Sequence, residues 1–185
     1  MQRERVLIAD LDELFSMKAG RHISASQIVD IQDNSHPYPC YGGNGLRGFV
    51  EIFNEEGDSL LIGRQGALCG NVQRVGGRFY ATEHAVVTRG KESVDLNFAY
   101  HLLDWMNLNQ YASKSAQPGL TVGKLSKLKV LIPQIAEQHR VASILDRFDR
   151  LTNDLSSGLP AEIEARRKQY EYYRDRLLSF DELAA

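Results

Sequence analysis

The stretch 141–155, VASILDRFDRLTNDL, decides the organisation of this 185-residue chain. Its apolar residues recur in steps of three, four, three and four positions, which is the spacing of a heptad seam along one face of an α-helix. An isolated helix in water cannot bury such a stripe, so the sequence predicts a partner helix. The seam residues are Val141, Ile144, Phe148, Leu151 and Leu155.

The same pattern resumes after the helix-breaking stretch Gly158-Leu159-Pro160. Pro160 suits the first turn of a new helix, so a kink or break is expected near 158–160. The sequence predicts a helical arm over 134–185, with about 45 helical residues that would reach ~65 Å if straight. Tyrosines are enriched in its second half, which is typical of an interface with a partner. The interface residues expected beyond the break are Ile163, Tyr170, Tyr173 and Leu177.

The residues before the arm, 1–133, have the composition of a strand-rich domain. Short apolar runs alternate with glycine turns, which predicts an α+β, mixed fold. A helix is expected over 97–108, with Phe98, Leu102, Trp105 and Met106 on its buried face. Residues 6–15 are expected to contain a helix at 10–14, and 17–38 to be mainly loop. The expected strands are 48–53, 59–63, 70–75, 79–82, 85–88 and 127–133.

The overall net charge of −2 hides an uneven distribution of basic residues. Four lysines and no acidic residue occur over 112–133, and five arginines occur between Tyr38 and Lys91. A basic surface on a near-neutral protein can bind phosphate. No leading signal segment and no long apolar run are present, so a cytoplasmic chain with no membrane partner is expected.

The sequence contains no motif with the context that catalysis requires. Residues 43–48 match the dinucleotide-binding spacing G-x-G-x-x-G but lack the preceding strand and following helix, so a glycine-rich turn is the better interpretation. Cys69 and His84 have no visible third residue to orient them as nucleophile and base. The two cysteines, Cys40 and Cys69, fit neither a disulfide framework nor a zinc site. We therefore expect no enzyme, no cofactor and no metal.

Binding to nucleic acid is better supported than catalysis. Glycine turns let the backbone approach a ligand closely, and arginine, amide and hydroxyl side chains contact bases and phosphates. Ordinary turn residues and a solvated loop over 110–123 are the alternatives. The candidate DNA-binding residues are Tyr41, Asn44, Arg47, Arg64, Gln65, Arg74, Arg78, His84, Lys114, Ser115, Lys124 and Lys127.

Several segments taken in order resemble the specificity (S) subunit of type I restriction-modification enzymes. The resemblance covers nearly the whole chain. The segments are Tyr41–Gly45, Leu61–Ala67, Thr82–His84, Leu125–Pro133, Glu137-Gln138, Ile144-Leu145, Leu159–Ile163 and Tyr170–Arg174.

The resemblance implies a non-catalytic role. Residues 1–133 would be a target recognition domain that reads one half of a split site in double-stranded DNA. Residues 134–185 would be a helical spacer that carries methyltransferase (M) subunits and, through them, restriction (R) subunits. The family usually has two recognition domains and two helical regions, and this sequence has one of each. A half-length form and a homodimer through the arms, paired as a coiled coil, are therefore expected. The alternatives are a protein-binding scaffold with no DNA specificity and a small Cys/His hydrolase.

Overall fold

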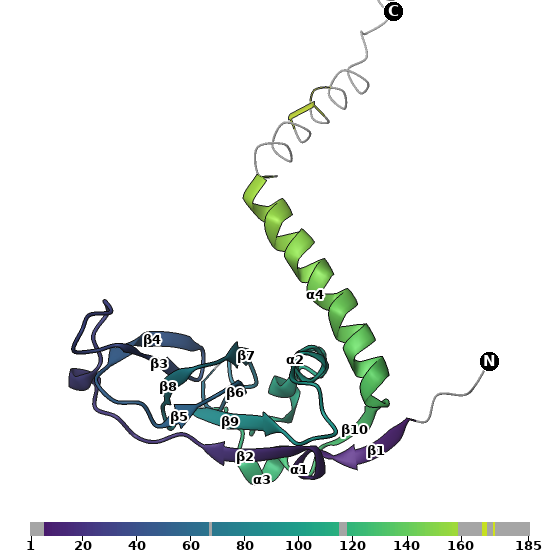
Figure 1. The fold of residues 1–185 in the computed structure, drawn as a ribbon, viewed down its shortest axis with the longest axis horizontal. Coiled ribbons are helices and arrows are strands. Elements are labelled where there is room, and N and C mark those ends of the chain that lie inside the picture. Colours follow the sequence, from purple (N-terminus) through teal and green to yellow (C-terminus); the bar gives the residue numbers. More distant parts are fainter. Residues whose placement is uncertain (1–5, 67, 115–117, 159–167, 170–171, 173–185) are drawn as a thin grey trace, which may run out of the picture. The chain divides into compact units, whose positions relative to one another are not determined.

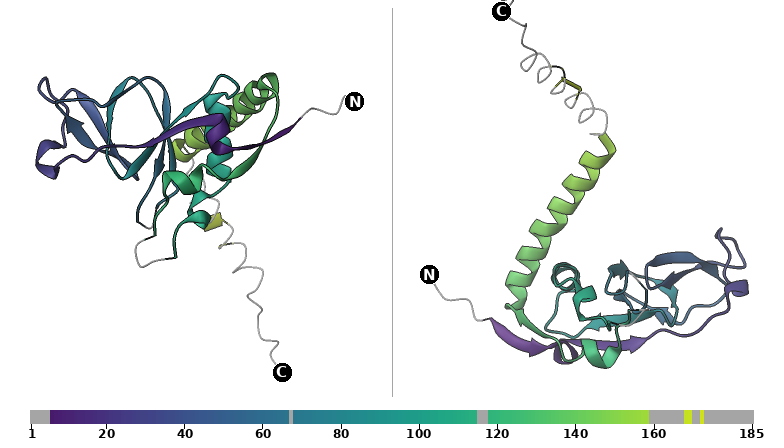
Figure 2. Two further views of the ribbon diagram at one scale, coloured as in Figure 1. Left: turned by 90° about the horizontal axis from the view of Figure 1, so that it is seen from below. Right: turned by 180° about the vertical axis from the view of Figure 1, so that it is seen from behind.

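A computed structural model describes residues 6–66, 68–114, 118–158, 168–169 and 172. The chain divides into two compact units, one ending at Ala142 and one beginning at Ser143. The first unit is strand-rich and contains three sheets in its described part (Figures 1 and 2). The mixed, strand-rich fold expected from the sequence is confirmed.

The central sheet has the strand order β2-β9-β6-β7 and is antiparallel throughout. Every residue of β6 is buried, as its continuous apolar sequence predicts for a central strand. The strands are β2 (Phe15–Ala19), β6 (Ser59–Gly63), β7 (Val72–Val75) and β9 (Ala85–Gly90).

A second sheet has the order β4-β3-β8-β5 and contains one parallel pair, β3 with β8. Strands β8 and β9 follow each other in the chain but belong to different sheets, so the segment between them joins the two. Its strands are β3 (Tyr38–Gly42), β4 (Gly45–Val50), β5 (Glu55–Glu56) and β8 (Arg78–Ala81).

A two-stranded sheet pairs β1 (Leu7–Asp10) with β10 (Lys129–Ile132) and brings the two ends of the first unit together. In β10, Val130 and Ile132 are buried and Leu131 between them is exposed, which is the alternation typical of a strand with one buried face and agrees with the strand expected over 127–133. Helix α2 (Leu96–Trp105) packs on the central sheet against β6, β7 and β9. The short helices are α1 (Leu11–Leu14), η1 (Ala25–Gln27), η2 (Leu108–Tyr111) and α3 (Val122–Leu125).

Three expectations for the secondary structure were wrong. The turn before β4 is only two residues long, so β4 begins at Gly45 instead of residue 48. Strand β3 was not expected because it contains Pro39, which lies where β3 pairs only with β4 and not with β8. Strand β2 replaces the start of the expected loop at 17–38 because it pairs with β9 over its whole length.

On α2, Phe98 is buried and Leu102 and Met106 pack against the core as expected, and only Trp105 differs from the expected buried face. Trp105 is 82% exposed, whereas Ala99 and Leu103 are fully buried. Trp105 lies at the edge of the apolar stripe, and the sheet contacts the side of the helix that carries Ala99 and Leu103. The helix ends before residue 108 because Asn107 takes a left-handed conformation with φ of 46°.

Helix α4 (Ile135–Gly158) begins within the first unit, with Glu137 in its first turn, where the helix dipole favours an acidic residue. Gln138 in this turn is 1% exposed and fully hydrogen-bonded. Its Oε1 accepts from the backbone N–H of Asp95 at 2.9 Å, and its Nε2 donates to the carbonyls of Ser93 (3.0 Å) and Pro133 (2.9 Å). This amide therefore fixes the start of α4 to the loop before α2. The expected break at 158–160 lies largely outside the described residues.

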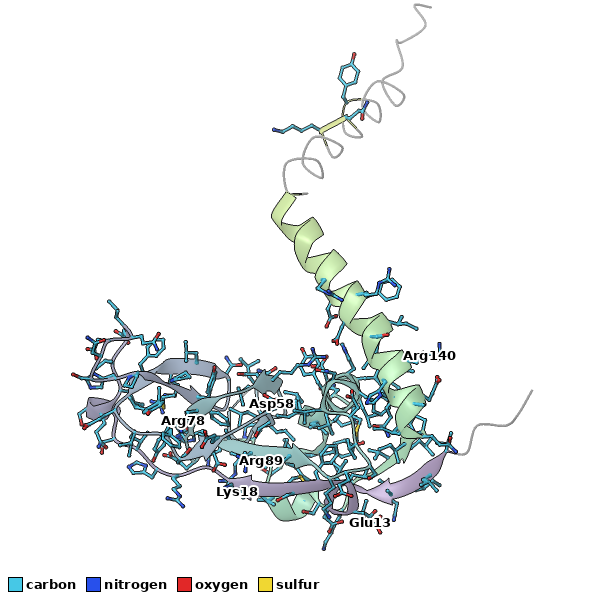
Figure 3. All side chains as sticks on the ribbon, in the orientation of Figure 1. Glu13, Lys18, Asp58, Arg78, Arg89 and Arg140 are labelled. Carbon is cyan, nitrogen blue, oxygen red and sulfur yellow. The ribbon has the colours of Figure 1, made fainter. Side chains whose placement is uncertain are left out.

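A buried carboxylate links three strands of the first unit. Glu55 of β5 is 6% exposed and pairs with Lys18 of β2 at 2.8 Å and with Arg89 of β9 at 2.9 Å. Arg89 also donates to Ser59 Oγ at 3.1 Å. Lys18 and Arg89 are labelled on their neighbouring strands in Figure 3. This cluster is structural, since each charge has an opposite partner.

Candidate nucleic-acid interface

A cleft of about 510 Å³ opens where three loops of the first unit meet. One loop is the turn between β3 and β4, the second is the segment after β6, and the third joins β8 to β9. Four of the residues predicted to bind DNA line this cleft, although they lie up to 40 positions apart in sequence (44 to 84). The lining residues are Gly42, Gly43, Asn44, Gly45, Leu46, Arg47, Gln65, Gly66 and His84.

Glycines allow the loops to approach this closely. A Cβ at Gly43 would lie 2.7 Å from the carbonyl oxygen of His84. A Cβ at Gly63 would collide with the carbonyl oxygen of Gly43. Both contacts are with backbone, which cannot move aside cheaply, so glycine is required at Gly43 in the turn and at Gly63 at the end of β6 for the loops to lie this close together.

The segment after β6 is held on both sides by backbone hydrogen bonds. The Arg64 N–H donates to the carbonyl of His84 at 2.8 Å. The Arg64 carbonyl accepts from Leu120 N–H at 2.8 Å, and the Gly66 N–H donates to the Pro118 carbonyl at 3.1 Å. Gln65 between them therefore projects from a fixed backbone.

Two amide side chains in the cleft each have their carbonyl oxygen occupied. Asn44 Oδ1 accepts from Nδ2 of Asn71 at 3.3 Å. Gln65 Oε1 lies 2.9 Å from Nδ1 of His84. Because a carbonyl oxygen can only accept, this contact is a hydrogen bond in the tautomer that carries its proton on His84 Nδ1. Among the described residues, no hydrogen bond occupies the NH₂ group of Asn44 or Gln65.

His84 is itself held by Glu83. The Glu83 carboxylate Oε1 lies 3.5 Å from His84 Nε2 and 2.9 Å from His22 Nδ1. Burial raises the pKa of the Glu83 carboxyl, but the hydrogen bond from His22, a backbone hydrogen bond and the electrostatic attraction of the two nearby imidazoles outweigh burial and leave the pKa lowered. Glu83 is therefore a carboxylate at neutral pH and orients both rings.

Arg47 supplies the positive charge of the cleft. Its stem crosses the backbone of Gly42, where a Cβ would lie 2.7 Å from Arg47 Cδ. The residue is exposed, and no hydrogen bond or ion pair to its guanidinium is found within the described part of the chain. A guanidinium only donates hydrogen bonds, so Arg47 adds donors beside the two amides.

Other predicted DNA-binding residues lie outside the cleft lining. Tyr41 packs edge-on against Phe79, with ring centroids 5.9 Å apart. Arg64 donates to the carbonyl of Glu83 at 2.9 Å and supports the cleft from its side. Arg74 lies 4.1 Å from the ring centroid of Tyr100, and Arg78 pairs with Glu56 at 3.0 Å. These side chains have structural contacts that the sequence did not reveal.

The lysines are exposed near α3 and in the loop before it. Lys124 lies in α3, where its N–H is capped by Thr121 Oγ1 at 3.2 Å. Lys114 and Lys127 are also exposed. Ser115 lies outside the described residues. Asn71, which positions Asn44, was missed because nothing in its local sequence distinguishes it from an ordinary turn residue.

The predicted interface residues fall into four groups. Val141 is partly buried against the main core of the first unit. On α4, Ile144 is 40% exposed and Phe148 is 61% exposed. Leu151 and Leu155 lie in α4, but the structure describes only their backbone. The remaining four, Ile163, Tyr170, Tyr173 and Leu177, lie outside the described residues.

The structure gives no support to a hydrolase. Cys69 is buried, and its Sγ contacts Nδ2 of Asn109 at 3.4 Å, whereas His84 contacts Gln65 and Glu83. Burial raises the pKa of the Cys40 thiol to about 11, so this second thiol is protonated at neutral pH. No described helix has the length and apolar character required to cross a membrane.

A strand-rich frame that holds hydrogen-bond donors in an open cleft defines a binding module. Comparison with known families identifies it: a family model described as "Type I restriction modification DNA specificity domain" matches residues 6–165. The chain belongs to this family, which confirms the family predicted from the sequence. The expectation that the chain is not an enzyme agrees with a specificity domain.

Curated relatives support the same family. The specificity subunit of the type I restriction enzyme EcoprrI from Escherichia coli is 57% identical over 146 residues, which cover 79% of this chain and 36% of that protein. A putative type I specificity subunit from Haemophilus influenzae is 36% identical over 152 residues, which cover 78% of this chain and 40% of that protein. The chain thus spans well under half the length of these relatives.

Solved structures agree on the fold. The S subunit of a type I restriction-modification system from M. genitalium matches with a TM-score of 0.71 at 23% identity, covering 98% of this chain and 48% of that chain. The HsdS subunit from Thermoanaerobacter tengcongensis matches with a TM-score of 0.65 at 16% identity, covering 88% of this chain and 42% of that chain.

Proposed function

We propose that this chain is a non-catalytic DNA-specificity module of a type I restriction-modification system. Residues 1–133 act as a target recognition domain that reads one half of a bipartite site in double-stranded DNA. Family membership over residues 6–165 is the observation that carries this proposal. The cleft supports it, since Asn44, Arg47 and Gln65 present hydrogen-bond donors from a rigid backbone.

Residues 134–185 act as a helical spacer that docks methyltransferase subunits and, through them, restriction subunits. Helix α4 supports this role because it carries exposed apolar residues, Ile144 and Phe148, on a heptad seam. Two copies pair through this seam and present two recognition domains with two-fold symmetry. The expected DNA site is then an inverted repeat with a fixed spacer.

Methylome sequencing of a host that carries the chain with the methyltransferase subunit of its own system tests the DNA-reading role. A bipartite palindromic modified motif is the expected result. A protein-binding scaffold would leave no modified motif that depends on the chain. A motif with two unrelated halves would contradict the symmetric dimer but support DNA reading.

The dimer is tested separately by Phe148→Asp, which places a charge in the seam. Light scattering of the variant should give the mass of a monomer, whereas the parent chain gives that of a dimer. Asp149→Asn is the matched control, because it changes a neighbouring residue outside the seam and should leave the dimer intact. A dimer that persists in Phe148→Asp would contradict pairing through α4.

A further inference from the structure

The cleft presents hydrogen-bond donors where amide side chains would ordinarily offer both donors and acceptors. Asn44 and Gln65 are the two amides, and each carbonyl oxygen is already engaged by a neighbour, Asn71 or His84. Arg47, the third polar side chain beside them, has no acceptor. Two independent contacts thus engage one lone pair of each amide oxygen, while no described residue accepts from either NH₂ group.

This arrangement selects among the base edges of the DNA major groove. Guanine presents two adjacent acceptors, N7 and O6, whereas adenine presents an acceptor next to an N6 donor. An amide that reads adenine needs both its oxygen and its nitrogen, and the oxygens of Asn44 and Gln65 are turned to protein partners. The N7 and O6 atoms of guanine accept hydrogen bonds from the NH₂ groups and the guanidinium, and the guanine edge presents no donor that would need an acceptor in the cleft.

Resting on the proposed function, we infer that the cleft reads a guanine edge and that His84 and Asn71 are positioning residues that set this preference. They act through Gln65 and Asn44 and determine which atom of each amide is available to the base. Glu83 completes the arrangement, since its carboxylate lies 3.5 Å from His84 Nε2 and helps to hold the ring.

The first test uses the unmodified chain in complex with its methyltransferase subunit. Once the modified motif is known, competition binding compares the natural duplex with duplexes that carry 7-deazaguanine at single positions of one half-site. Loss of one N7 acceptor in contact with the cleft should weaken binding roughly tenfold, in the range of a good base contact. Equal affinity for every 7-deazaguanine duplex overturns the inference.

The second test changes the positioning residue. His84→Ala releases the carbonyl of Gln65, so adenine becomes acceptable and the preference for guanine over adenine at one position should fall about tenfold. His84→Asn keeps an N–H donor near Gln65 Oε1 and should restore the preference. An unchanged preference in His84→Ala contradicts the role of His84, provided that the parent and variant have the same melting temperature.

The third test reverses the chemistry of the amide. Gln65→Glu keeps the shape but replaces the NH₂ donor with a carboxylate oxygen, so affinity for the guanine duplex should fall more than affinity for a duplex with adenine at that position. Asn34→Asp, an exposed amide outside the cleft lining, adds the same charge and is the control.

The outcomes separate this inference from the proposed function. A phosphate oxygen also only accepts hydrogen bonds, and if the cleft binds phosphate, Gln65→Glu will weaken binding equally on all sequences and reduce the salt dependence. That result would overturn guanine reading while leaving DNA binding intact. A parent complex with no sequence preference would instead contradict the proposed function itself.

Discussion

Two glutamines in the first unit illustrate the difference between structural and binding sites. Gln138 is 1% exposed, and its carbonyl oxygen and its NH₂ group together make three hydrogen bonds to backbone. Gln65 is exposed at the cleft, its carbonyl oxygen is held by His84, and no described residue accepts from its NH₂ group. The hydrogen-bonding groups of the glutamine side chain are therefore all used at Gln138, whereas at Gln65 only the carbonyl oxygen is used.

The comparison teaches which polar groups are available for recognition. A saturated buried amide stabilises the fold and has nothing left to offer a ligand. A half-engaged amide on a fixed backbone costs little entropy to order on binding and offers a defined donor. Substitutions at the two glutamines test whether the two regions of the first unit differ in this way.

The largest effect on stability is expected for Gln138→Ala. The change leaves the N–H of Asp95 and the carbonyls of Ser93 and Pro133 without their partner, which should lower the free energy of unfolding by about 3 kcal/mol. Urea denaturation of the full chain measures it. Gln65→Ala is the matched control and should stay within about 0.5 kcal/mol of the parent. Equal stability of the two variants would contradict the assignment of a structural role to Gln138 and a binding role to Gln65.

A smaller loss is expected for Glu55→Gln. The side chain of Glu55 is 5% exposed, and its neutral replacement leaves Lys18 and Arg89 without a counter-charge. Both cations are partly exposed and recover some hydration, so the expected loss is about 2 kcal/mol. Glu56→Gln affects the exposed pair with Arg78 and should cost under about 1 kcal/mol, as judged by the same denaturation experiment.

The buried thiol of Cys40 should give the smallest effect, a pH dependence. Its pKa is raised from 9.0 to about 11, so the folded state binds the proton more tightly than the unfolded state. The stabilisation is complete below pH 9 and is lost as the pH rises toward 11, with about 1 kcal/mol lost between pH 9 and pH 10. Cys40→Ala should remove this component of the pH profile. Identical profiles for the parent and the variant would show that the thiol does not titrate in this way.

Much of the frame could be predicted from local sequence. The apolar run of β6, the alternation in β10 and the start of α4 were all visible because burial imposes a period on the sequence. Strands β2 and β3 were missed because their place depends on pairing with distant strands, and the proline in β3 argued against a strand. The exposure of Trp105 was not predicted because it depends on which side of α2 contacts the sheet.

The sequence predicted which types of residue form the candidate site, but it did not predict how these residues contact one another. Glycine turns with Asn44, Arg47 and Gln65 pointed to a binding surface, and the structure brings these residues together with His84. The contacts of Arg74 and Arg78 with Tyr100 and Glu56 were not predictable, since they join residues far apart in the sequence. The role of Asn71 also depends on a contact between separate loops.

The most direct test of the central claim, that the cleft chooses the DNA sequence, is the modified motif of two matched arginine variants. Arg47 lies in the cleft, and Arg78 lies outside its lining and pairs with Glu56. Methylome sequencing of hosts that carry each variant with the methyltransferase subunit should show a lost or relaxed base in the motif for Arg47→Ala and the parental motif for Arg78→Ala. A parental motif in Arg47→Ala, at normal protein levels, would contradict the account.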